Sequence, residues 1–73
     1  MSQEIEQLKT EYQDAVRRQQ NAEINLKHSP DSRFCEAAVR LENRVSQRIR
    51  LQLEAAGVGV LEIVRLEQEA RGE

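Results

Sequence analysis

The first third of the chain carries an apolar repeat whose spacing alternates between three and four residues, which is the pattern of a heptad. The repeat runs through Ile5, Leu8, Tyr12, Ala15, Gln19, Ala22 and Leu26. In a helix these positions form one seam, and such a seam is buried only against a partner helix. The repeat therefore predicts a helix over about residues 2–28, with its first turn capped by the Ser2 hydroxyl.

A short turn signal follows this helix. In the sequence His28-Ser29-Pro30-Asp31, Ser29 is suited to cap a new helix and Pro30 to occupy its first position. A connection as short as residues 28–31 places consecutive helices side by side and antiparallel. We therefore expect a helical hairpin of the coiled-coil type.

The composition agrees with an all-α fold. Of the 73 residues, 33% are charged and 38% are apolar, and the aromatic residues are one Tyr and one Phe. Abundant Glu, Gln, Arg, Leu and Ala favour long helices. A chain of this length has room for one domain, and a lone hairpin of this size is only marginally stable. We predict one helical-hairpin domain over residues 1–73 that assembles into a helical bundle.

A second apolar stripe follows the turn, with a spacing closer to eleven residues over three turns, which keeps phase with a nearly straight helix. The stripe comprises Phe34, Ala38, Leu41, Val45, Ile49, Gln52, Ala56, Val60 and Ile63. Folding the chain near residue 30 brings apolar positions of the two stripes opposite one another at nearly every level. Gln19 is the exception, and we expect it either at the edge of the seam or fixing the register from within it.

The segment Ala55-Ala56-Gly57-Val58-Gly59 is the main ambiguity of the fold. Each glycine in a helix interior costs about 1 kcal/mol relative to alanine, yet the apolar stripe keeps its phase across the segment. We therefore predict one long second helix over about residues 30–71. Two alternatives stay open: a break at Gly57–Gly59 followed by a short third helix, or a strand over Val58–Leu66, where β-branched residues are dense.

The tail carries more apolar side chains than the hairpin has room to bury. The first helix is used up at Ile5, which leaves six side chains without a partner in their own hairpin: Val58, Val60, Leu61, Ile63, Val64 and Leu66. Together they form too large an apolar surface to leave in water. We predict that residues 57–73 are an oligomerisation extension that forms a homodimer or a higher helical bundle. The alternative is that they bind a different protein.

Basic residues concentrate between residues 17 and 50, and both ends of the chain are acidic. Four arginines are predicted to lie on the face of the second helix opposite its apolar stripe: Arg33, Arg40, Arg44 and Arg48. A solvated face is the simpler interpretation. The alternative is a surface for nucleic acid or an acidic protein, because arginine binds phosphate and carboxylate in a bidentate manner. The pI of about 5.4 disfavours nucleic acid.

The sequence offers little reactive chemistry. His28 and Cys35 flank the turn, but a histidine at a helix end and a cysteine beside Phe34 have simpler structural roles. No spacing of Cys, His or carboxylates matches a metal site, and Gly57-Val58-Gly59 lacks the rest of a phosphate-binding loop. We therefore expect no enzyme activity, no cofactor and no metal.

Two further features bear on location and function. The single cysteine, the acidic start of the chain and the lack of a run of about 20 apolar residues predict a cytoplasmic protein that makes no use of the membrane. The expected function is that of a non-catalytic interaction module, a small regulatory or adaptor protein acting as a homo-oligomeric helical bundle. The alternative function is an RNA- or DNA-binding regulator that uses the arginine face.

Overall fold

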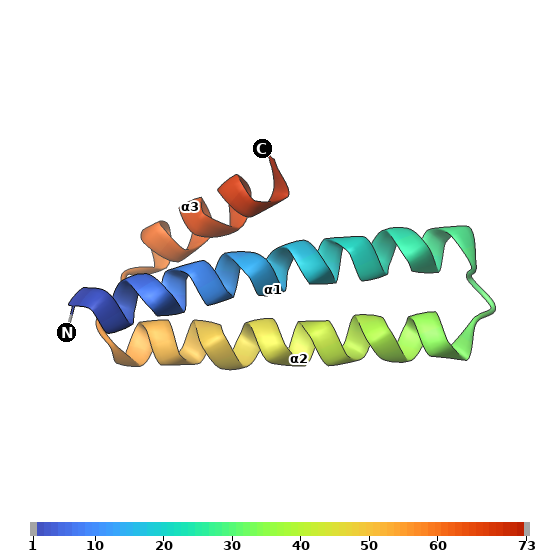
Figure 1. Cartoon of the computed structure of the whole chain (residues 1–73), viewed down its shortest axis with the longest axis horizontal. Coiled ribbons are helices and arrows are strands. Elements are labelled where there is room, and N and C mark those ends of the chain that lie inside the picture. Colours follow the sequence, from blue (N-terminus) through green and yellow to red (C-terminus); the bar gives the residue numbers. More distant parts are fainter. Residues whose placement is uncertain (1, 73) are drawn as a thin grey trace.

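The computed structural model describes the backbone of residues 2–72 and the side chains of residues 3–72. Within these residues the chain is all-α, with three helices: α1 (Ser2–His28), α2 (Arg33–Ala55) and α3 (Val60–Arg71). α1 and α2 form the predicted hairpin, and α3 folds back across α1 (Figure 1). The all-α prediction is confirmed, and the strand alternative for Val58–Leu66 is wrong. The predicted cap by the Ser2 hydroxyl lies outside the described side chains.

The turn of the hairpin differs in detail from the prediction. α1 ends at His28, and the Ser29 N–H donates to the Asn25 carbonyl at 3.0 Å. α2 begins at Arg33 rather than near residue 30. Its N-cap is Ser32, whose hydroxyl accepts a hydrogen bond from the Cys35 N–H at 3.2 Å. A serine three positions before the amide it binds is a standard N-cap. Ser32, and not Pro30, therefore sets the start of α2.

The predicted long helix over about residues 30–71 is wrong, and the alternative with a break at Gly57–Gly59 is correct. α2 ends in a Schellman motif, in which the Gly57 N–H donates to the Glu54 carbonyl and the Val58 N–H to the Leu53 carbonyl, both at 3.0 Å. Gly57 has a φ of +92°, a conformation that favours glycine. Although the apolar stripe keeps its phase across the break, its members Ala56 and Val60 are exposed, and α3 buries Ile63, Leu66 and Ala70.

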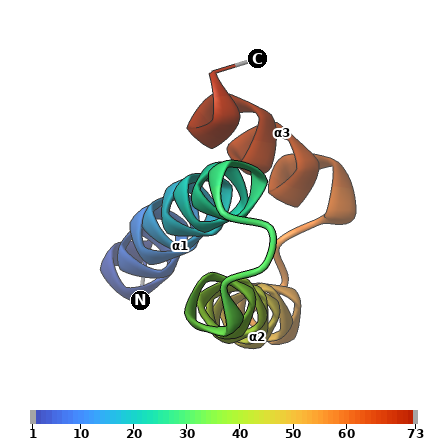
Figure 2. The same ribbon diagram turned by 90° about the vertical axis from the view of Figure 1, so that its right-hand side faces the viewer.

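The return of α3 completes a three-helix core at the end of the hairpin away from the turn. α1 lies between α2 and α3 (Figure 2). All three helices contribute to the core, which consists of Tyr12, Ala15, Val16, Ile49, Leu53, Ile63, Leu66 and Ala70. Complete burial of an aliphatic side chain contributes about 1.5–3 kcal/mol. α3 covers only part of α1, so the turn end of the hairpin is two helices thick (Figure 1).

The buried face of α2 departs from the predicted eleven-residue stripe near the turn. Ser46, Ile49 and Leu53 are buried at heptad spacing, whereas Phe34 and Leu41 are 84% and 57% exposed. The predicted stripe is therefore wrong at these two positions, and also at Gln52, Ala56 and Val60, which are exposed. The seam of α1 has a heptad period, and a partner stays in register with it only by using the same period.

Gln19 lies at the edge of this seam, half-buried. Its Oε1 accepts a hydrogen bond from the Ser46 hydroxyl at 2.9 Å, and its Nε2 donates to the Asn43 Oδ1 at 3.4 Å. The polar position of the seam therefore meets a small hydroxyl and an amide of α2.

Candidate interaction surfaces

α3 has one buried and one exposed apolar face. Ile63 and Leu66 are buried in the core of their own chain, and Val58 is half-buried against it. These three members of the predicted oligomer interface are thus already covered, because the tail turns back. The remaining three stay uncovered and form what we call the α3 patch: Val60, Leu61 and Val64, which are 56%, 86% and 40% exposed.

Polar contacts along its margin fix how α3 lies on α1. The Lys9 Nζ is 3.4 Å from the Glu62 Oε1. Further along, the Gln13 Nε2 donates to the Leu66 carbonyl and to the Glu69 Oε1, each at 3.2 Å. Residue numbers rise together along both helices in these contacts. α3 therefore runs in the same direction as α1 and opposite to α2.

The contact of α3 with α1 changes the pKa of Tyr12 and, at its margin, of Glu62. Tyr12 is buried, and its hydroxyl lies 3.5 Å from the Glu67 Oε2. Burial raises the pKa of Tyr12 above its ordinary value of 10.0, and the negative charge of Glu67 raises it further. At the margin, the hydrogen bond from Arg65 holds the pKa of the Glu62 carboxyl below its usual value, and Lys9 acts in the same direction.

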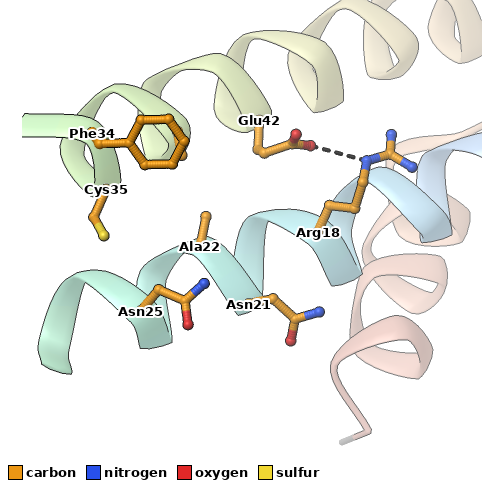
Figure 3. Close-up of a pocket in the computed structure, with 8 residues that line it drawn as sticks. Arg18, Asn21, Ala22, Asn25, Phe34, Cys35 and Glu42 are labelled. Atoms are coloured by element: carbon orange, nitrogen blue, oxygen red, sulfur yellow. Dashed lines mark hydrogen bonds and ion pairs between the residues drawn. The ribbon is translucent and has the colours of Figure 1, made fainter. Parts of the chain in front are cut away.

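A second exposed surface lies at the turn end of the hairpin, where a groove of about 270 Å³ opens between α1 and α2. We call it the tip groove (Figure 3). The exposed ring of Phe34 stands at one end and an ion pair between Arg18 and Glu42, at 3.1 Å, closes the other. The groove stays open because the side chains of Ala22 and Ala38 are too small to fill the space between the two helices.

The amides of Asn21 and Asn25 form the α1 side of the tip groove. At 100° per residue, these two asparagines lie on a different flank of α1 from Tyr12 and Gln13, which contact α3. The tip groove and the α3 patch are therefore separate surfaces. Sequence reasoning did not predict the groove, because it assigned Phe34 to the buried seam. The one sequence signal of space between the helices is that each stripe carries an alanine near the turn, Ala22 and Ala38.

The arginine face of α2 is arranged as predicted. All four side chains are exposed: Arg33, Arg40, Arg44 and Arg48. Within the described residues only Arg40 among them forms an ion pair, with Glu36 one turn away on the same helix. α2 carries five arginines and three glutamates, so it is the basic helix of an otherwise acidic chain.

The remaining reactive side chains do not gather into one site. Cys35 is half-buried beside Phe34 in the tip groove, and His28 is exposed at the end of α1. In the part of the chain that the structure describes, no three His, Cys, Asp or Glu residues are grouped so as to hold a metal ion. None of the described helices combines the length and apolar character needed to cross a membrane.

Comparison with known proteins adds no family assignment. No protein-family model, curated protein or solved structure matches the chain.

Proposed function

We propose that the chain is a non-catalytic interaction module, a small regulatory or adaptor protein that acts as a self-associated helical bundle. The observation that carries the proposal is the exposure of large apolar side chains on the folded chain, led by Phe34 and Leu61. Scattered exposed leucines are ordinary, but apolar side chains gathered on one helix face or beside a groove mark contact surfaces.

We assign a different contact to each of the two apolar surfaces. The α3 patch consists of aliphatic side chains on one helix face, which suits contact with a second copy of the chain. The tip groove combines the ring of Phe34 with the amides of Asn21 and Asn25 and a charged pair at its far end. Such a mixture of one aromatic anchor and a few polar groups suits a partner protein of a different kind.

Self-association is tested by measuring the molar mass in solution over a range of concentrations. We expect the wild-type chain to shift from monomer to dimer as its concentration rises. Leu61→Asp should remain monomeric, because it places a charge in the α3 patch while an acidic residue in the first turn of α3 leaves that helix stable. The matched control is Leu51→Asp, since Leu51 is 63% exposed but lies on α2 away from the patch.

A chain that stays monomeric at all concentrations would contradict self-association. Equal weakening of the dimer by Leu51→Asp and Leu61→Asp would contradict the assignment of the α3 patch. In that case the charge of the substituted residue, and not its position, would account for the effect.

The tip groove is tested with a photoreactive amino acid placed at Phe34 and, as a control, at Leu51 of the same helix. We expect illumination in the cells of origin to join a defined second protein to position 34 and not to position 51. Labelling at both positions with the same set of proteins, or only with copies of the chain itself, would contradict a partner site in the groove.

The arginine face supports a second candidate, nucleic-acid binding, because Arg33, Arg44 and Arg48 are exposed and free of ion pairs within the described residues. If the face binds phosphates, affinity for duplex RNA should fall linearly with salt on a double logarithmic plot. Replacing Arg40, Arg44 and Arg48 by alanine should reduce that slope by about three, whereas Arg17→Ala should change it little. Absence of binding at low salt would eliminate this candidate.

A further inference from the structure

We propose that two copies of this chain exchange α3. In the exchanged dimer, α3 of each copy packs on α1 of the other, and residues 56–59 join α2 and α3 into one continuous helix. The inference rests on the proposed self-association and gives that association a geometry.

α3 is attached to its own chain through α1 and hardly at all through α2. Its buried residues Ile63, Leu66 and Ala70 belong to the core that Tyr12 of α1 and Leu53 of α2 share. Even so, α3 lies mainly against α1 and touches α2 little (Figure 2). Moving α3 away from its own α2 therefore breaks few contacts. The α1 surface that receives α3 is identical in a second copy, so the main contacts are recovered in full.

The loop between α2 and α3 can either end the helix, as it does here, or continue it. Residues 56–59 contain two glycines, and a side chain added to Gly57 or Gly59 would meet nothing within 4 Å. The Schellman bonds of Gly57 and Val58 hold the turn through backbone groups alone. The apolar stripe meanwhile keeps helical phase across the loop from Leu53 to Val60. Short hinge loops of this kind favour exchange of an element between copies.

The direction of α3 is compatible with exchange. In the closed chain, the form in which α3 packs on its own α1, α3 runs parallel to α1, as the pairs Lys9–Glu62 and Gln13–Glu69 show. A straight helix formed from α2 and α3 leaves its own hairpin at the end where α1 begins. If a two-fold axis places a second hairpin end to end with the first, that helix enters the second hairpin running parallel to its α1. The same pairs then form between the two chains.

Exchange also gives the α3 patch a partner. Val60, Leu61 and Val64 all lie in the first half of α3, which is the part nearest the loop. In the exchanged dimer the two loops come together at the two-fold axis. The first turns of the two α3 helices then adjoin one another, and the side chains exposed in the closed chain become the contact between copies.

The test uses the natural sequence and a water-soluble carbodiimide, which joins a lysine amine to a nearby carboxylate as an amide. Equal amounts of ¹⁴N- and ¹⁵N-labelled chains are unfolded together, refolded and cross-linked in the dimer fraction, and the linked peptides are weighed. We expect about half of the Lys9–Glu62 peptides to carry mixed isotopes, as random pairing of two copies requires. Lys9 also lies 3.4 Å from Glu6 within α1, and this link must never be mixed.

Hinge variants provide the second measurement. Gly57→Ala strains the closed loop, where Gly57 has a φ of +92°, and favours a continuous helix, so it should lower the dimer dissociation constant by about twentyfold or more. The control is Gly72→Ala. Gly72 has a φ of +80° at the end of α3, a conformation that is the same in both forms, so this substitution should leave the dissociation constant almost unchanged.

The outcomes separate exchange from self-association. A dimer in which Lys9–Glu62 links join only chains of one isotope, and which Gly57→Ala does not stabilise, would overturn exchange and leave the proposed function standing. A chain that is monomeric at every concentration would overturn both.

Discussion

Tyr12 reports on the packing of α3 because it is the only tyrosine of the chain. Burial, together with the nearby Glu67 carboxylate, raises the pKa of its hydroxyl above 10.0. We predict that titration of the folded chain, followed by the ultraviolet absorbance of the phenolate, gives a midpoint above 10.0 and that the urea-unfolded chain titrates near the ordinary value. Equal midpoints in the two states would contradict the buried position of Tyr12.

The same shift makes stability depend on alkaline pH. Because the folded chain keeps the Tyr12 proton to a higher pH than the unfolded chain, this contribution to the free energy of unfolding is fully present below about pH 10 and is lost as the pH rises through the folded pKa. In Tyr12→Phe no such group titrates. The fall in the urea midpoint above pH 10 should therefore be steeper for the wild-type chain than for the variant.

The hydrogen bond between Ser46 and Gln19 is the polar element of the hairpin seam. Ser46 is buried and its hydroxyl donates to the Gln19 Oε1 at 2.9 Å. We predict that Ser46→Ala lowers the free energy of unfolding by about 1 kcal/mol, because a partly buried acceptor loses its donor. Adding Gln19→Leu should recover most of that loss, as measured by urea denaturation. A double variant as unstable as the single one would show that the hydrogen bond is not the cause.

At the scale of the helices, the hairpin follows from the sequence and the third helix does not. The heptad of α1 and the turn at Ser29-Pro30 predict two antiparallel helices, because a buried seam needs a partner within reach. The end of α2 before Gly57 cannot be predicted in this way. Its cause is a left-handed φ and two backbone hydrogen bonds, and an apolar stripe carries no information about either.

The candidate surfaces were predictable to different extents, because a sequence pattern gives the face of a helix on which a residue lies but not how the helices pack. The arginine face follows from periodicity alone, and α2 displays it as expected. The oligomer interface was predicted from a count of apolar side chains, which included Ile63 and Leu66, and both of these are buried in the core of their own chain. The tip groove depends on Phe34 pointing out of the seam, and the sequence stripe placed it inside.

α2 offers a direct test of which leucines hold the helices together. Leu53 is fully buried between the three helices, whereas Leu51, two residues earlier, is 63% exposed. We predict that Leu53→Ala lowers the free energy of unfolding by about 2–5 kcal/mol, enough to unfold much of so small a chain. Leu51→Ala should change it by less than about 0.5 kcal/mol. Similar effects in chemical denaturation would contradict the placement of α2.

The whole molecule is uneven along its length of 43 Å. Three helices meet at the end where α1 begins, and two helices with small or polar residues at their contact form the other end (Figure 1). Local opening costs least where the fewest apolar side chains are buried. The tip groove therefore lies in the half of the molecule where local opening costs least. A partner that binds there can shift α1 and α2 at a lower cost in free energy.

This unevenness predicts a gradient of amide hydrogen exchange. Amides of residues 22–26 and 37–41, near the turn, should exchange through local opening with a lower free energy than amides of residues 12–16 and 49–53, which pass through the three-helix core. Filling the groove should remove part of the difference: Ala38→Leu adds apolar contact between α1 and α2 and should slow exchange near the turn selectively. If exchange is uniform along both helices, the chain opens only as a whole, and the tip groove has no special freedom to adapt to a partner.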